Sequence, residues 1–247
     1  MNSIEIIAIP DVPFIRLGDN IGQILCDTAK ANGFEFISGD VICIASKAIS
    51  MAEGRQVDLN TVNVSEVALS IHKKIPRKDP RILQVIIDQT EAPDGSRIDI
   101  DSNYIAGWLP NGIRLTSSGV DKLGPDEVIL IPEDSDRSAK NISRTIREVT
   151  GIQVGVIVTD SDGREDKAGS NQIAIGVYGV PALRKTETTD SDGKPSITEE
   201  TSCDLLAGSA ALIMGQRGTN KPAVVIRGYD YEFDQTSSIS DALILRI

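Results

Sequence analysis

The stretch VGVIVTDSDGR, residues 154–164, joins an apolar strand pattern to an acidic end. Residues 154–158 are mostly β-branched, which is typical of a strand covered on both faces. Residues 160–163, DSDG, favour a turn, so we expect the strand to end there. The simpler interpretation is an Asx-type turn completed by Gly163. The other is a ligand site at the carboxyl end of a strand, which requires polar residues that converge from elsewhere in the chain.

The composition indicates a self-sufficient globular protein. A chain of 247 residues can bury roughly 70–75% of its unfolded surface, and we expect one domain over residues 1–247. The net charge of −11, from 36 acidic and 25 basic residues, argues against nucleic acid or an anionic membrane as a partner. An anionic small ligand can still bind such a chain through metal ions.

The cysteines and the apolar runs indicate the compartment. Cys26, Cys43 and Cys203 lie far apart among apolar residues and form no C-x-x-C pair. We expect buried thiols in a reducing compartment, with the cytoplasm as the default. Because no apolar run reaches about 18 residues and no basic region precedes an apolar core at the N-terminus, we expect neither a membrane span nor a signal peptide.

Apolar periodicity and capping residues predict the other elements. Asp19 is expected to cap a helix that ends at Gly33. Ser196 and Glu199 match a capping box ahead of a helix that ends at Gly215. Further strands are predicted over 4–9, 40–45 and 222–228, and further helices over 64–75, 79–87 and 138–149.

The single histidine, His72, falls beside the apolar stripe of the helix predicted over 64–75. No cysteine or carboxylate stands at ligand spacing from it, so we expect a surface histidine. A serine–histidine triad is therefore disfavoured.

Four polar loops are predicted to follow strands or a helix end, at 46–50, 117–124, 160–167 and 216–221. Asp121 and Asp160 supply hard carboxylate ligands suited to Mg²⁺ or Mn²⁺. Five cations of these loops could neutralise phosphates: Lys47, Arg164, Lys167, Arg217 and Lys221. The chain contains neither a Walker A pattern nor G-x-G-x-x-G, so a nucleotide would bind in an uncommon mode.

The chain resembles the coenzyme F420:L-glutamate ligases, the γ-glutamyl ligases of the deazaflavin cofactor, from about residue 5 to 230. The tracts that carry the resemblance are VICIASKAIS with AEGR, SSGVD, LIPEDSDRSA, VGVIVTDSDGR, AIGVYGVPAL and LIMGQ leading to KPAVVIRG. The resemblance implies an α+β fold of mixed sheets with flanking helices, in a homodimer. It also implies two divalent ions and GTP, with L-glutamate and a deazaflavin or related carboxylate as substrates joined through an acyl phosphate.

The resemblance assigns site residues by position. The expected metal ligands are Asp121, Asp160, Ser161 and Gln216. The expected nucleotide contacts are Val12, Pro13, Phe14, Ile15, Ser46, Lys47, Met214, Gly215, Gln216, Arg217, Gly218, Thr219, Asn220 and Lys221. Catalytic roles are expected for Asp160, Arg164 and Lys167.

Three departures from the family pattern bear on the substrates. Met51 replaces a lysine expected at the nucleotide, and Gly124 replaces an asparagine. Glu165 and Asp166 stand where the family carries aromatic and basic residues. We therefore expect weaker GTP binding or acceptance of ATP, and an acceptor that is neutral or amine-bearing rather than the family's usual one.

Two other readings remain open from the residues. A haloacid-dehalogenase-like phosphatase also places D-x-D-G after an apolar strand, with its first aspartate as nucleophile, but that motif normally lies near the N-terminus. A phosphoenzyme trapped at Asp160 would support it. A non-catalytic nucleotide- or metal-binding relative is the second, and nucleotide binding without turnover would support that one.

Overall fold

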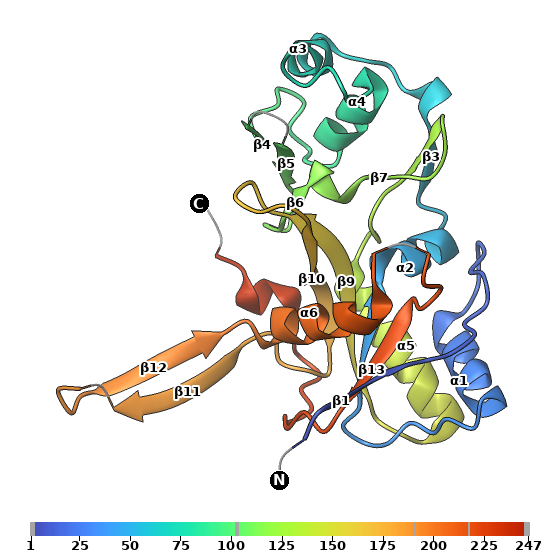
Figure 1. The fold of residues 1–247 in the computed structure, drawn as a ribbon, viewed down its shortest axis with the longest axis vertical. Coiled ribbons are helices and arrows are strands. Elements are labelled where there is room, and N and C mark those ends of the chain that lie inside the picture. Colours follow the sequence, from blue (N-terminus) through green and yellow to red (C-terminus); the bar gives the residue numbers. More distant parts are fainter. Residues whose placement is uncertain (1–2, 102–103, 190, 217, 245–247) are drawn as a thin grey trace.

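The structure is a computed structural model that describes residues 3–101, 104–189, 191–216 and 218–244. A five-stranded sheet in the order β1-β13-β2-β9-β10 lies at its centre (Figure 1). Strands β2 and β9 are parallel, and every other neighbouring pair of this sheet is antiparallel. The strands are β1 (Glu5–Ala8), β13 (Ala223–Arg227), β2 (Val41–Ala45), β9 (Gly155–Gly163) and β10 (Ser170–Tyr178).

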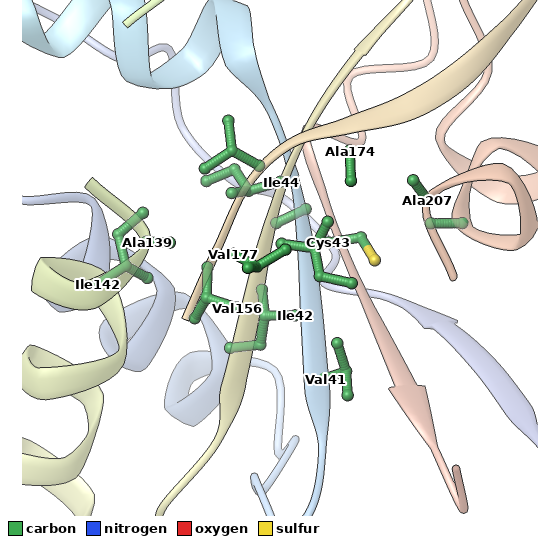
Figure 2. Close-up of a cluster of buried hydrophobic side chains, with 14 of the residues drawn as sticks. Val41, Ile42, Cys43, Ile44, Ala139, Ile142, Val156, Ala174, Val177 and Ala207 are labelled. Carbon is green, nitrogen blue, oxygen red and sulfur yellow. The ribbon is translucent and has the colours of Figure 1, made fainter. Parts of the chain in front are cut away.

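Helices cover both faces of this sheet. Figure 2 shows Ala139 and Ile142 of α5 (Ser135–Thr150) on one side of the strands and Ala207 of α6 (Ser202–Met214) on the other. Helix α1 (Ile21–Ala31) packs against α5 so closely that a Cβ added to Gly22 would lie 2.6 Å from Thr145 Cβ. Mixed sheets with flanking helices confirm the expected α+β class.

A second, smaller apolar cluster lies apart from the first. It is built around Leu59, Leu83 and Ile105. The elements that contribute to it are α3 (Glu66–Lys74), α4 (Pro80–Asp88), β3 (Gln56–Asp58), β4 (Ile98–Asp101), β5 (Tyr104–Trp108) and β8 (Glu127–Ile129). Strand β6 (Arg114–Thr116) pairs with β5 but buries Leu115 in the main core, and β7 (Asp121–Lys122) pairs with β8. Whether the two clusters form one domain, as we predicted, stays a prediction.

The acidic end of the quoted stretch is not a turn. Strand β9 continues to Gly163, and Ser161 pairs with Gln172 while Asp162 pairs with Asn171 of β10. The prediction that residues 160–163 end the strand is therefore wrong. Cross-strand pairing outweighs the turn preference of DSDG here, and the reversal falls between Arg164 and Gly169, where Gly169 has a φ of 95°.

Two predicted helix starts are also wrong. Asn20, not Asp19, caps α1, because its side chain accepts a hydrogen bond from the Gln23 N–H while Asp19 accepts from Arg16 N–H. The capping-box residues Ser196 and Glu199 lie in β12 (Pro195–Glu200), which pairs with β11 (Arg184–Thr189) in a projecting hairpin (Figure 1). Helix α6 begins only at Ser202, and it ends before Gly215 as predicted.

Other expectations are confirmed. The three cysteines are free and buried. Pro80 begins α4 with Asp79 as its cap. Among the helices of the described residues, none has the length and apolar character required to span a bilayer.

Candidate active site

Helix α2 (Ser46–Glu53) starts directly after β2, so the polar loop predicted after that strand is instead a helix. Its cap residue, Ala45, provides no side-chain hydrogen bond to the first turn. The first N–H groups of a helix lack partners within it and favour anions. The start of α2 therefore suits a phosphate group.

The first two residues of α2 contact two carboxylates from distant parts of the chain. Ser46 Oγ donates a hydrogen bond to Asp160 Oδ1. Lys47 Nζ lies 3.0 Å from Asp121 Oδ2, and both side chains remain about half exposed. One helix start thus brings together the two residues that the sequence singled out as metal ligands.

The carboxyl group of Asp160 has a raised pKa. The pKa of Asp160 is raised to about 7, chiefly by burial and also by the charges of Asp121 and Asp162, while the hydrogen bond from Ser46 opposes the shift. A carboxyl group whose pKa is raised by neighbouring carboxylate charges lies close to them. A cation placed there would displace the proton and relieve the repulsion.

Asp162 has a structural partner. Its Oδ1 accepts hydrogen bonds from Thr116 N (2.8 Å) and Thr116 Oγ1 (2.7 Å), which joins β9 to β6. Side chains alternate along a strand, so Asp160 and Asp162 lie on one face of β9 and Ser161 on the other. Ser161 can therefore share an ion with Asp160 only through its main-chain carbonyl.

The end of α6 and the loop after it lie beside the same corner. Met214 Sδ is 3.8 Å from the hydroxyl of Thr159, the neighbour of Asp160. The loop closes on itself, because Thr219 Oγ1 donates to Met214 O, and it ends where Pro222 O accepts from Ala45 N (2.8 Å). Gln216, Gly218, Asn220 and Lys221 are therefore carried close to the start of α2, while Arg217 falls outside the described residues.

The expected nucleotide contacts before α1 lie in an extended loop. Ile15 is buried in the main core, Val12 packs partly against it and Pro13 is exposed. Phe14 is 76% exposed and leaves an aromatic face open to a ligand. No hydrogen bond or ion pair among the described residues joins this loop to Asp160, so its part in the site stays a prediction.

The structure does not bring Arg164 or Lys167 to the carboxylates. The Arg164 guanidinium is 63% exposed and binds Asp166 through Nε–Oδ1 (2.8 Å) and Nη2–Oδ2 (2.9 Å). Lys167 is exposed on the same turn. Because Arg164 neutralises Asp166, the acidic character that we inferred for this turn from the sequence is weaker than expected.

Sequence reasoning missed Lys78 and Thr116, and it included Ser117 only as part of the polar loop 117–124. Lys78 Nζ donates to Ser117 Oγ (2.8 Å) four residues before Asp121. A lysine ahead of an Asp-Pro helix start has no distinctive pattern, so no local signal identified it. Only the fold places it opposite the SSGVD tract.

The donor set fits divalent ions of the Mg²⁺ type. No three His, Cys, Asp or Glu side chains of the described residues gather around one point. Mg²⁺ commonly takes one or two carboxylates, with water and substrate phosphates completing its octahedron. Two buried oxygens without a hydrogen-bond partner among the described residues belong to this region: Ser50 Oγ, one turn after Ser46, and Gln172 Oε1, opposite Ser161.

The fold and this corner define an α+β protein with a candidate metal-and-phosphate site. A family model described as F420-0:Gamma-glutamyl ligase matches residues 10–228. The chain belongs to this family.

The chain is similar to curated relatives over most of their length. It is 34% identical to a coenzyme F420:L-glutamate ligase of Methanopyrus kandleri over 242 residues, which cover 95% of this chain and 92% of the relative. It is 31% identical to the protein of that name from Methanothermobacter thermautotrophicus, covering 92% of this chain and 90% of the relative. The Methanocaldococcus jannaschii relative is 32% identical, with coverages of 93% and 90%.

Proposed function

We propose that this chain is a GTP-dependent ligase that joins L-glutamate to the carboxylate of F420-0, or of a related acceptor, through an acyl phosphate. The family and its relatives, whose names state glutamate ligation to coenzyme F420, support this proposal. The observation that carries it is the start of α2, where Ser46 and Lys47 each contact one of two carboxylates beside uncapped N–H groups.

In this proposal the polyphosphate lies at the start of α2, with Lys47 released from Asp121 to contact it. Two divalent ions would be held by Asp121, Asp160, the Ser161 carbonyl and Gln216. Such ions neutralise the charge that develops during phosphoryl transfer. Without them the net negative charge of this corner would repel the nucleotide.

The reaction has two steps. An oxygen of the acceptor carboxylate attacks the γ-phosphorus, and the bond to GDP breaks, which gives an acyl phosphate. The neutral amine of glutamate then attacks the acyl carbon, loses its proton, and phosphate leaves with the C–O electron pair. The sum is amide, GDP and phosphate. The protein contributes chiefly positioning and charge complementarity, because phosphoryl transfer requires little covalent chemistry from a protein.

Two departures affect the nucleotide. Met51 Sδ accepts from Gln56 Nε2 (3.5 Å) and the side chain packs against the main core, so no cation stands at that position. A Cβ at Gly124 would meet only open space, so an amide contact is missing there too. We propose that GTP binds to this chain more weakly than it would to a chain with lysine at position 51 and asparagine at position 124. A non-catalytic relative is the second candidate; membership of the ligase family leaves the phosphatase alternative without support.

The test is incubation with Mg²⁺ or Mn²⁺, GTP or ATP, L-glutamate and F420-0, followed by mass spectrometry and a phosphate assay. A glutamyl adduct formed together with phosphate is the expected result. Nucleotide bound but never cleaved would favour the non-catalytic relative. Cleavage without an adduct would support a different acceptor.

A further inference from the structure

Lys78 is a partly buried cation that forms no ion pair with the described residues. It lies between α3 and α4, and its backbone is fixed by a hydrogen bond between Lys78 O and His72 Nδ1 (2.9 Å). Among the described residues, no Asp or Glu carboxylate lies within 4.0 Å of its ammonium. Burial lowers the pKa of Lys78, and the nearby charge of Arg77 lowers it further. Proteins rarely bury a charged group unless an oppositely charged or hydrogen-bonding group compensates the charge.

The partner of Lys78 is a serine on a strained turn. Ser117, Ser118 and Gly119 have φ values of 54°, 52° and 72°. Left-handed backbone is unfavourable for serine and is found mostly where surrounding structure enforces it, commonly at ligand sites. Ser118 Oγ fixes the turn by donating to Ile86 O (2.9 Å), which leaves Ser117 directed at Lys78.

The pair presents unused donors. Ser117 Oγ accepts from Lys78, and no acceptor for its own hydroxyl proton is found among the described residues. The ammonium has three N–H donors, of which the Ser117 bond uses one. Two groups that need acceptors therefore stand side by side.

This pair comes from other elements of the fold than the nucleotide contacts that the resemblance assigned. Lys47, which binds Asp121 directly, is the second residue of α2, whereas Lys78 lies between α3 and α4. Lys78 is close enough to Asp121 for the carboxylate charge to act on its pKa. The nucleotide contacts that the resemblance assigned lie before α1, in α2, or at the end of α6 and in the loop after it. The one family position beyond Asp121, Gly124, has no side chain to make such a contact. The nucleotide therefore does not account for the unused donors of Lys78.

We propose that Lys78 Nζ and Ser117 Oγ bind a carboxylate of a substrate other than the nucleotide. The source is either the acceptor or the incoming amino acid, and this inference rests on the proposed ligase function. A carboxylate held there would lie next to Asp121 and hence next to the site of phosphoryl transfer. The pair neutralises the charge that would otherwise repel an anionic substrate from the acidic corner.

The test compares wild type with Lys78→Met, Lys78→Arg and Ser117→Ala. The matched control is Lys73→Met, which removes the same charge from an exposed position on α3. Calorimetry in the presence of Mn²⁺ and GDP measures the Kd of F420-0 and of L-glutamate separately, and a second titration measures GTP with Mn²⁺. Circular dichroism melting confirms that each variant is folded.

Lys78→Met is expected to weaken binding of one of the two carboxylate substrates by roughly 10- to 100-fold, the loss typical of a charge-assisted hydrogen bond. Ser117→Ala should weaken the same substrate by a smaller factor, Lys78→Arg should retain most of the affinity, and Lys73→Met should match wild type. GTP affinity should stay within about threefold throughout. The substrate that loses affinity identifies the source of the carboxylate.

Unchanged Kd values for both carboxylate substrates in a folded Lys78→Met variant would overturn the inference. An equal loss for GTP would also overturn it, because Lys78 would then only fasten the turn before Asp121. If Lys78→Met does not fold, Ser117→Ala decides the question by the same criteria. A wild-type protein that binds both substrates but forms no amide would contradict the ligase proposal and leave the subsite standing.

Discussion

Lys47 Nζ lies 3.0 Å from Asp121 Oδ2, so an ammonium group holds the carboxylate that the proposed metal ion would use. The ion and Lys47 must then compete for Asp121. Lys47→Met should raise Mn²⁺ affinity in the absence of nucleotide by about two- to fivefold, because an exposed ion pair is worth roughly 0.2–1 kcal/mol. The same variant should bind GTP more weakly, since it loses a phosphate contact.

Electron paramagnetic resonance of free Mn²⁺ measures this competition. Lys122→Met is the control, because it removes an equal charge next to Asp121 from a lysine that is not paired with it. A gain in Mn²⁺ affinity as large in Lys122→Met as in Lys47→Met would show a general charge effect and reject the competition.

The raised pKa of Asp160 makes stability depend on pH. This carboxyl group shifts from 3.8 to about 7 on folding, so its favourable protonated state is fully present below pH 3.8 and is lost as the pH rises through 7. Asp160→Asn should therefore stabilise the metal-free protein at pH 8 by on the order of 1–2 kcal/mol. The gain should vanish near pH 4.

Urea unfolding of wild type and Asp160→Asn at the two pH values, with a chelator present, provides the measurement. Asn keeps the oxygen that accepts from Ser46, so the comparison isolates the charge. An Asn variant that is less stable than wild type at pH 8 would mean that the carboxylate is compensated, not strained.

Thr116 joins the three-stranded sheet β4-β5-β6 to β9 through Asp162 and Gly163. Its Oγ1 contacts Asp162 Oδ1 (2.7 Å) and Gly163 O (3.1 Å). Thr116→Val keeps the shape and leaves a part-buried carboxylate with fewer donors, so we expect a loss of about 1–3 kcal/mol in the free energy of unfolding. Thr186→Val, on the exposed hairpin, is the control, and an equal change in both variants would reject this assignment.

The homodimer stays a prediction, and α6 offers a surface for it. Leu205 and Leu212, seven residues apart on one helix face, are 54% and 82% exposed. Paired exposed leucines on a helix face are typical of association surfaces. Leu212→Lys should shift the mass measured by light scattering from dimer to monomer at micromolar concentration. A wild-type monomer would reject the dimer itself.

The sequence predicted the strands and helices whose signals are local. The start of α4 at Pro80 and the end of α6 before Gly215 were predicted correctly. The residues that decide each of these helix boundaries are adjacent in the chain. The turn predicted over residues 160–163 was wrong, because their conformation depends on pairing with β10 and on a hydrogen bond from Thr116, which is distant in the sequence. The capping box predicted at Ser196 and Glu199 was wrong for the same reason, because pairing of these residues with β11 outweighs a short capping pattern.

The site was predicted in outline for a similar reason. Asp121 and Asp160 stand out as acids after strands, and the fold brings both to the start of α2. Lys78 has no local signal, because only its contact with Ser117, in a distant segment, places it. Arg164 was expected at the site from the resemblance, and the structure pairs it instead with Asp166, two residues further along the chain.

We propose that Asp121 and Asp160 form one metal-dependent nucleotide site. Calorimetry of GTP with Mn²⁺ on wild type, Asp121→Asn and Asp160→Asn measures what each carboxylate contributes, with Asp230→Asn, an exposed aspartate, as the control. Both site variants should lose well over about tenfold in affinity, because the polyphosphate lacks its counter-charge when either ligand is removed, and Asp230→Asn should match wild type. Equal affinity of Asp160→Asn and wild type for GTP in the presence of Mn²⁺ would contradict the claim.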